Sequence, residues 1–381
     1  MDYSYIINQL GENRENYFNS IAPPIIQTSN FAFDSVEKMR EGFSNEINNY
    51  CYTRGKNPTT EILEKKMAAL EESEDALIVS SGVSAISLSI ISNLKAGDHI
   101  VCVKDPYSWT NKLLNKLLAR FNITVSMVDG TDPKNYEKEI TENTKIFYME
   151  TPNSFTFELQ DIEEICKIAK KNNIITIVDN SYSSFLNQKP IKLGADIVIY
   201  SASKYIGGHS DVVAGIICSS KKMIEQIFYN KYMNFGNIIS PNDSWLLIRG
   251  LRTLEMRLER VSKTALKVIE FLKNHEKVEK IIYPFDIDFP QYELAKKQMK
   301  SATGLFTVKF KFKDRKEAEI FSNSLKRFIL AVSWGGYESL ILPTCAFPDT
   351  NIPFDLIRFY TGFEAPEVLI DDLKNAFKKL S

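Results

Sequence analysis

Seven short apolar segments, separated from one another by helical or polar stretches, constrain the fold of this chain more than any other feature. Most are rich in β-branched residues, and several are apolar throughout, which is typical of strands covered by helices on both faces. Strands that alternate with helices in this way predict an α/β domain with a seven-stranded, mostly parallel sheet. The predicted strands cover residues 76–80, 99–103, 123–128, 145–149, 174–178, 196–200 and 213–218.

The sequence before and after this region shows different patterns. Residues 1–56 lack a long periodic segment and carry turn signals, so they predict an extended N-terminal arm. A long helical stretch from Trp245 to about His275 predicts the entry into a smaller α+β domain. We therefore expect an arm over 1–56, a large domain over 57–243 and a C-terminal domain over 244–381. In the last of these, strands are expected near 305–311, 327–333 and 355–360, and helices near 314–326 and 366–380.

Composition excludes several classes of partner. The 47 basic and 48 acidic residues give a net charge of −1, which argues against nucleic acid or an anionic membrane as a partner. Five scattered cysteines without CxxC spacing and three dispersed histidines indicate neither a disulfide framework nor a metal site. The chain shows no signal peptide and no apolar run long enough to span a bilayer, so a cytoplasmic protein with no membrane contact is expected.

The segment from Ser201 to Gly215 contains the first candidate catalytic residue, Lys204. It directly follows an apolar strand, which is where open α/β sheets bind their ligands. A lysine that is partly desolvated at the end of a strand has a lowered pKa and becomes a nucleophile toward an aldehyde. A lysine after a strand is more often simply solvated, so the interpretation depends on the residues that accompany it.

Asp179 ends the predicted strand 174–178. A carboxylate at the carboxyl end of a strand can pair with the pyridine nitrogen of pyridoxal phosphate and keep that nitrogen protonated. The alternative is an ordinary turn or helix-capping aspartate.

Two further segments carry groups suited to a phosphate. Ser80 to Ala85 lie between a strand and a helix, where small residues expose backbone N–H groups at the positive end of the helix. Tyr52 and Arg54 combine a phenol with a guanidinium, which binds phosphate through two hydrogen bonds. A tight turn and a solvated arginine are the respective alternatives.

Together these segments resemble the Cys/Met-metabolism family of pyridoxal-phosphate enzymes, and the match runs in order over almost the whole chain. The family pattern SATKYxxGHSDVVxG is matched closely by Ser201 to Gly215, and YxYxRxxNPT by Tyr50 to Thr59. SSGMSAI is matched by Ser80 to Ile86 with Val83 in place of methionine, and DNTFAT loosely by Asp179 to Ser184. RGLKTL, GGxESL and IRxxxGxE are matched by Arg249 to Leu254, Gly335 to Leu340 and Ile357 to Glu364.

The resemblance implies a pyridoxal 5'-phosphate enzyme of transferase fold type I, with a role for each matched residue. Lys204 would hold the cofactor as a Schiff base and shuttle protons, and Asp179 would bind the pyridine nitrogen. Tyr107 would stack on the cofactor ring and assist proton transfer. The substrate carboxylate would be held by Arg358 with help from Ser333. The phosphate would be held by Ser81, Gly82, Val83, Ser201 and Ser203, and by Tyr52 and Arg54 from a neighbouring subunit.

The last assignment implies a homo-oligomer in which pairs of subunits share active sites, either a dimer or a tetramer. The expected partner besides a second copy is a small amino-acid substrate.

Three departures from the family pattern bear on the substrate. YGGT is replaced by Tyr107-Ser-Trp109-Thr, and ESPxNP by Glu150-Thr-Pro-Asn153-Ser-Phe155, which displaces the family's asparagine by one position. Asn153 is the candidate to replace that asparagine as a substrate-binding residue. SLGG is replaced by Ser333-Trp334-Gly-Gly, and the stretch that continues from it resembles bacterial cystathionine β-lyase.

On this basis the first hypothesis is β-elimination from cystathionine, with Trp334 as a substrate-binding residue. The alternatives on the same scaffold are cystathionine γ-lyase, methionine γ-lyase and cystathionine γ-synthase. A non-catalytic α/β protein that merely keeps the fold is disfavoured, because a binding module would not need Lys204, Asp179, Tyr107 and Arg358 together.

Overall fold

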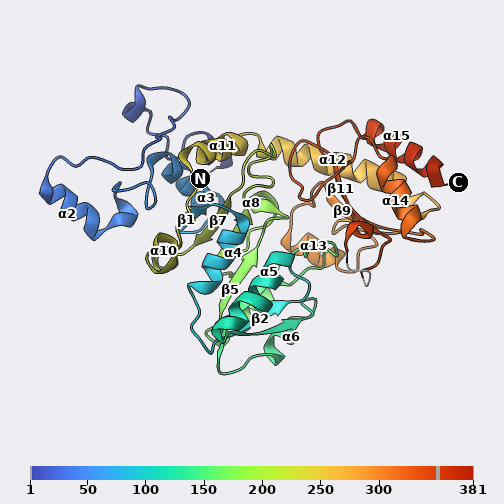
Figure 1. Cartoon of the computed structure of the whole chain (residues 1–381), viewed down its shortest axis with the longest axis horizontal. Coiled ribbons are helices and arrows are strands. Elements are labelled where there is room, and N and C mark those ends of the chain that lie inside the picture. Colours follow the sequence, from blue (N-terminus) through green and yellow to red (C-terminus); the bar gives the residue numbers. More distant parts are fainter. Residues whose placement is uncertain (1, 349–351, 381) are drawn as a thin grey trace.

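The computed structural model describes residues 2–348 and 352–380, in which the larger of two sheets has seven strands (Figure 1). The strand order is β1-β7-β6-β5-β4-β2-β3, in which β7 runs antiparallel to both of its neighbours and all other pairs are parallel. Every predicted strand of this sheet is found, with ends that differ by no more than two residues. The strands are β1 (Asp75–Val79), β2 (His99–Val103), β3 (Thr124–Val128), β4 (Thr144–Glu150), β5 (Ile175–Asp179), β6 (Ile197–Ser201) and β7 (Gly215–Ser219).

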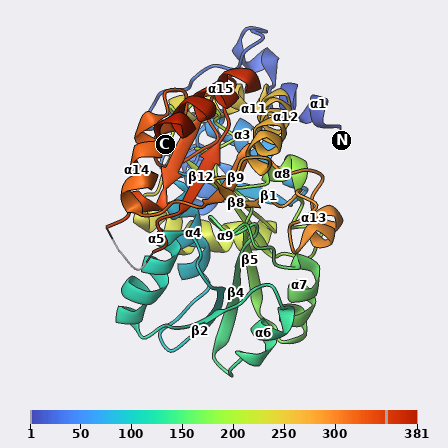
Figure 2. The same ribbon diagram turned by 90° about the vertical axis from the view of Figure 1, so that its right-hand side faces the viewer.

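Helices cover both faces of this sheet, which explains why its central strands are apolar throughout. Figure 2 shows α4 and α5 on one side of the sheet and α7 on the other. Local capping decides where two of the helices begin: the side chain of Asn57 caps α3 and that of Ser81 caps α4. The helices of this part are α3 (Pro58–Glu71), α4 (Gly82–Ile91), α5 (Ser108–Lys112), α6 (Pro133–Lys138), α7 (Ile162–Lys171), α8 (Ser184–Asn187), α9 (Lys221–Ile227) and α10 (Met233–Phe235).

A second, mixed sheet forms in the C-terminal part, with the order β10-β11-β12-β9-β8. Two of its strands, β8 and β11, were not predicted. The first carries two exposed charged residues, so it lacks the apolar run of a buried strand, and the second is a short apolar segment that ends at a proline. The elements are β8 (Val278–Ile282), α13 (Tyr292–Gln298), β9 (Leu305–Phe310), α14 (Arg315–Ser324), β10 (Ile329–Leu330), β11 (Leu340–Pro343), β12 (Leu356–Tyr360) and α15 (Pro366–Phe377).

The long helix expected from Trp245 is interrupted, giving α11 (Pro241–Leu251) and α12 (Leu254–Lys273). At the break the guanidinium of Arg257 donates a 2.7 Å hydrogen bond to the carbonyl of Gly250, near the end of α11. The same guanidinium donates to the carbonyl of Tyr205, next to the candidate lysine (2.7 Å). Side chains from the first half of α12 pack in the core of the large sheet, and those from its second half in the core of the second sheet. The helix therefore joins the two parts.

The N-terminal arm contains two short helices, α1 (Tyr3–Asn8) and α2 (Val36–Ser44), which the sequence did not predict. Figure 1 shows α2 standing away from the body of the molecule. Several large apolar side chains of the arm are exposed in the single chain, among them Phe18, Ile21 and Val36. None of the helices in the described residues is both long and apolar enough to cross a membrane.

Candidate active site

Three neighbouring strands of the large sheet end at the candidate site. Glu150 ends β4, Asp179 ends β5 and Ser201 ends β6. In the sheet register Glu150 lies directly beside Asp179. Because the carboxyl ends of parallel strands meet at one edge of a sheet, this is the edge where a ligand is expected. Lys204 follows Ser201 in the turn after β6, so the predicted lysine and aspartate are brought together.

Lys204 lies in a setting that suits a nucleophilic amine. Its Nζ donates a hydrogen bond to the hydroxyl of Ser333, and it lies 5.6 Å from the ring centroid of Trp334. Burial and the nearby charge of Arg358 lower the pKa of Lys204 to about 8, against the opposing effect of Asp179. At neutral pH a larger share of this amine is therefore uncharged than for a solvated lysine.

Glu150 is the main site residue that the sequence analysis missed. Its carboxylate accepts hydrogen bonds from the backbone N–H of Tyr107 (2.6 Å), and from the backbone N–H and hydroxyl of Ser154 (2.8 and 2.7 Å). Burial and the adjacent Asp179 raise the pKa of Glu150 to about 7. The rule that selected Asp179, a carboxylate at the end of a predicted strand, would also have selected Glu150.

The negative charge of the buried Asp179 carboxylate is poorly compensated by its surroundings. It accepts a 3.0 Å hydrogen bond from the backbone N–H of Ser181, and burial raises its pKa above the usual range. Tyr107 precedes α5 with 40% of its surface exposed, and burial of the phenol together with Asp179 and Glu150 raises the pKa of Tyr107. Its ring is therefore accessible beside two carboxyl groups.

Three of the predicted phosphate-binding residues lie at the N-terminus of α4. Ser81 caps the helix with its hydroxyl, and Gly82 and Val83 form the first turn. A Cβ atom at Gly82 would lie 2.9 Å from Cβ of Ser201, so only glycine allows this close approach between α4 and β6. Ser203 lies two residues beyond Ser201, and its hydroxyl accepts a 3.0 Å hydrogen bond from the N–H of Ala214. The backbone N–H groups of a helix start and several hydroxyls thus meet at one place.

Residues from the C-terminal part complete the site. Ser333 has a left-handed backbone (φ 77°), and Gly335 lies so close that a Cβ atom there would come within 2.9 Å of Cα of Lys204. Trp334 is half-buried and packs on the ring of Tyr205 at 5.2 Å. Arg358 lies on β12 and donates a long hydrogen bond, 3.5 Å, to the carbonyl of Ser333. The lysine, the serine and the arginine are therefore in one chain of contacts.

Asn153 and Trp109, both discussed as departures from the family pattern, differ in their surroundings. Asn153 is 1% exposed, and its amide donates to the carbonyls of Lys104 and Asp105 (both 3.2 Å) and accepts from Gln160 (2.6 Å). All of these contacts hold the loop, so the geometry does not favour a contact between Asn153 and substrate. Trp109 is 52% exposed and packs under the ammonium of Lys112.

Tyr52 and Arg54 lie in the N-terminal arm. The guanidinium of Arg54 packs on the ring of Tyr52 at 5.6 Å, and both side chains are exposed in the single chain. Their predicted role in the site of a neighbouring subunit stays a prediction.

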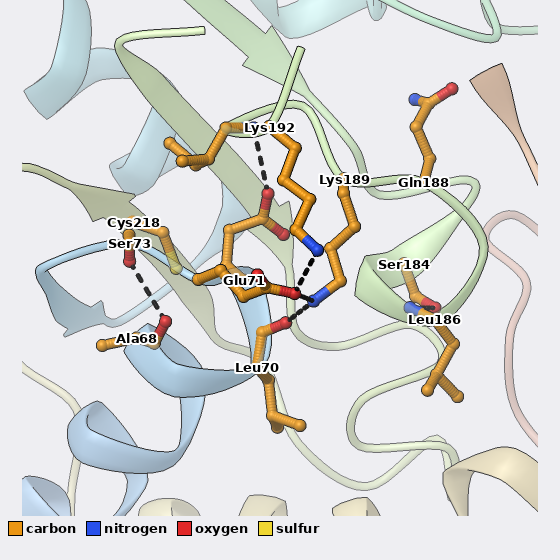
Figure 3. Close-up of polar contacts among 12 residues, drawn as sticks. Ala68, Leu70, Glu71, Ser73, Ser184, Leu186, Gln188, Lys189, Lys192 and Cys218 are labelled. Carbon is orange, nitrogen blue, oxygen red and sulfur yellow. Dashed lines mark hydrogen bonds and ion pairs between the residues drawn. The ribbon is translucent and has the colours of Figure 1, made fainter. Parts of the chain in front are cut away.

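A buried polar network links the ends of β5 and β6 to the end of α3. The sequence analysis did not predict this network. The hydroxyl of Tyr200, on β6, donates to Glu71 at the end of α3 and accepts from the amide of Asn180 (3.1 Å), the residue after Asp179. Figure 3 shows Glu71 and Leu70 facing the loop that carries Lys189 and Lys192, where Lys189 donates to the carbonyl of Leu70. Burial raises the pKa of Glu71 to about 8.

Comparison with known proteins decides what this arrangement is. Residues 5–378 match the family described as Cys/Met metabolism PLP-dependent enzyme. The chain belongs to this family. An L-methionine gamma-lyase of Fusobacterium nucleatum subsp. polymorphum is 40% identical, over 96% of this chain and 95% of that protein. A cystathionine beta-lyase of Lactococcus lactis subsp. cremoris is 36% identical, over 97% of each. The crystal structure of metB from Corynebacterium glutamicum superposes with a TM-score of 0.93 at 34% identity, covering 100% of this chain and 99% of that one.

The protein is thus a pyridoxal-phosphate-dependent enzyme of the carbon–sulfur lyase family, and the recognition of its family and fold from sequence is confirmed. The residues present fit the cofactor. The start of α4 offers N–H groups and hydroxyls to its phosphate, the poorly compensated Asp179 suits its protonated ring nitrogen, and Lys204 suits its aldehyde. When bound, the cofactor acts as an electron sink for the bonds at the substrate's α-carbon.

Proposed function

We propose that this enzyme catalyses γ-elimination from L-methionine, which consumes one water molecule and releases methanethiol, 2-oxobutyrate and ammonia. The observation that carries the proposal is the similarity, at 39–41% identity over 96% of the chain, to several proteins named L-methionine gamma-lyase. The proteins named cystathionine beta-lyase are similar at 36%. The comparisons therefore favour a γ-lyase, an alternative in the sequence analysis, over the β-lyase that was its first hypothesis.

The arrangement of proton-transferring groups supports γ-elimination. This reaction requires removal of a proton from Cα and then from Cβ before the γ-thiolate leaves. Lys204, with a pKa of about 8, is suited to accept the first proton, to release it again, and then to accept the second. Tyr107 lies at the same edge of the sheet, with its phenol available to protonate the departing sulfur. Arg358, whose pKa burial lowers to about 10, holds the substrate carboxylate in this proposal.

A second candidate, β-elimination from cystathionine, is favoured by Trp334. This indole is half-buried against Tyr205 and lies beside Lys204. An indole at that position narrows the space around the amine, and it offers an aromatic wall to the longer thioether of cystathionine. The other indole, Trp109, supports this candidate less, because it lies over half exposed beside Lys112 in the single chain.

Product analysis distinguishes the two candidates. The purified holoenzyme is incubated separately with L-methionine and with L-cystathionine, and 2-oxobutyrate and pyruvate are quantified. We expect 2-oxobutyrate and methanethiol from methionine. Pyruvate as the main product from cystathionine, without turnover of methionine, would contradict the proposal and support the β-lyase. Lys204→Ala serves as the control for background cleavage by free cofactor.

We also propose that the working enzyme is a homo-oligomer in which two subunits share each pair of sites. The exposed Tyr52 and Arg54, and the apolar side chains exposed along the arm, support this. We likewise propose that the chain divides into an arm over 1–56, a large domain over 57–243 and a C-terminal domain over 244–381. The two separate cores on either half of α12 support it.

A further inference from the structure

The guanidinium of Arg358 has unused hydrogen-bond donors. Among the described residues, it donates one hydrogen bond, the 3.5 Å contact with the carbonyl of Ser333, and no carboxylate forms an ion pair with it. A guanidinium carries five N–H donors, so most of them are free for a ligand. The side chain is half-buried on β12, where burial opposes its charge. Hydrogen bonding within the protein therefore contributes little to the position of this group.

Phe155 supports this guanidinium group. The central carbon of the Arg358 guanidinium lies 4.9 Å from the centroid of the Phe155 ring, within the range of a cation–π contact. The ring of Phe347 meets Phe155 edge-on at 5.9 Å. Phe155 follows β4 in the large domain, whereas Arg358 and Phe347 belong to the C-terminal part. The stack therefore joins the two parts of the molecule at the active site.

The backbone of Phe155 argues that its position is not a packing accident. It has a left-handed conformation (φ 63°), which is unfavourable for a bulky residue and is found mainly where function or surrounding structure requires it. Phe157 nearby is also left-handed, but it is fully buried against Tyr182, so packing accounts for it. Phe155 is partly exposed and belongs to none of the buried cores. It also stands where the pattern ESPxNP has proline.

We propose that Phe155, supported by Phe347, is a positioning residue that holds the guanidinium of Arg358 ready for the α-carboxylate of the substrate. The inference rests on the proposed role of Arg358 as the carboxylate-binding residue. A ring under the guanidinium restricts the rotamers of a long side chain before the ligand arrives, and so reduces the entropy that binding must overcome. The contact is with the face of the ring and uses no conventional hydrogen bond, so the N–H donors that Ser333 does not use stay available to a ligand.

Ligand affinity tests this directly. L-Norleucine has a methylene in place of the methionine sulfur and so carries no thiolate to eliminate, and 1-aminopentane is the same molecule without the carboxylate. Their dissociation constants are measured on the holoenzyme from the change in the visible absorbance of the bound cofactor. In Phe155→Leu we expect norleucine to bind about tenfold more weakly, with 1-aminopentane unchanged. Phe155→Tyr, which keeps the aromatic face, should bind norleucine as the parent enzyme does.

The outcomes separate this inference from the proposed function. If Phe155→Leu binds norleucine like the parent, or loses affinity for both ligands equally, the positioning role is wrong. If Arg358→Leu does not weaken the binding of norleucine more than that of 1-aminopentane, Arg358 is not the carboxylate-binding residue. The role that the proposed function gives to Arg358 is then wrong. Should Phe155→Leu fold poorly, Phe347→Leu removes the edge contact alone, and a smaller, carboxylate-dependent loss is expected. No carboxylate-dependent loss in that variant would overturn the inference.

Discussion

The lowered pKa of Lys204 leads to a prediction about how the apoenzyme takes up its cofactor. Covalent attachment requires the uncharged amine. With a pKa of about 8 instead of 10.5, the uncharged fraction at pH 7 is about one tenth instead of about one in three thousand. Lys204 should therefore react roughly three-hundredfold faster than a solvated lysine of equal nucleophilicity.

The assay measures the rate at which the visible absorbance band appears after apoenzyme is mixed with excess pyridoxal phosphate between pH 6 and 10. Rates with Nα-acetyl-lysine at each pH, divided by the fraction of its ε-amine that is uncharged at that pH, give the effect of the cofactor's own ionisation, and the enzyme rates are corrected for that effect alone. The corrected rate should rise with pH and level off, with a midpoint near pH 8, the pKa of Lys204.

Two variants at Arg358 identify the cause of the lowered pKa of Lys204. Burial is the largest cause and the positive charge of Arg358 the second. Arg358→Leu removes the charge, so the midpoint should rise but stay below 10.5, because burial remains. Arg358→Lys keeps the charge and should leave the midpoint close to that of the parent. A parent midpoint near 10.5, or an unchanged midpoint in Arg358→Leu, would refute this account of the lysine.

Three further predictions follow from the site and its support. Lys204→Ala should retain the cofactor without a covalent bond and lose turnover by several orders of magnitude; near-normal kcat would contradict the assignment. Arg54→Ala should lose cofactor on dialysis while remaining folded, and mixing it with Lys204→Ala should restore part of the activity through hybrid sites; an active monomer on sedimentation would exclude this arrangement. Glu71 holds a proton in the folded protein up to about pH 8 but releases it near pH 4.5 when unfolded. The free energy of unfolding should therefore fall between these values by about 1.4 kcal/mol per pH unit on account of this group. In urea denaturation Glu71→Gln should show a smaller fall from pH 5 to pH 7, and an equal slope would show that Glu71 is ionised in the folded state.

The sequence by itself determined the large sheet and two of its candidate site residues. A buried parallel sheet requires apolar strands between helices, so the strand positions could be predicted within two residues. Lys204 and Asp179 could be predicted because ligands bind at the carboxyl ends of such strands. The capping of α4 by Ser81 is also a local feature, which depends on neighbouring residues in the chain.

Only the tertiary structure decided how the charged groups interact. The pKa of Glu150 depends on the sheet register that places it beside Asp179. Asn153 could be named as a candidate from its place in a motif, but the direction of its side chain follows from the carbonyls that the loop brings near.

The contact between Phe155 and Arg358 joins residues about two hundred positions apart, and no local pattern encodes it. Burial, Coulomb interaction and ring stacking all depend on distances in space, which a sequence specifies only through the complete fold.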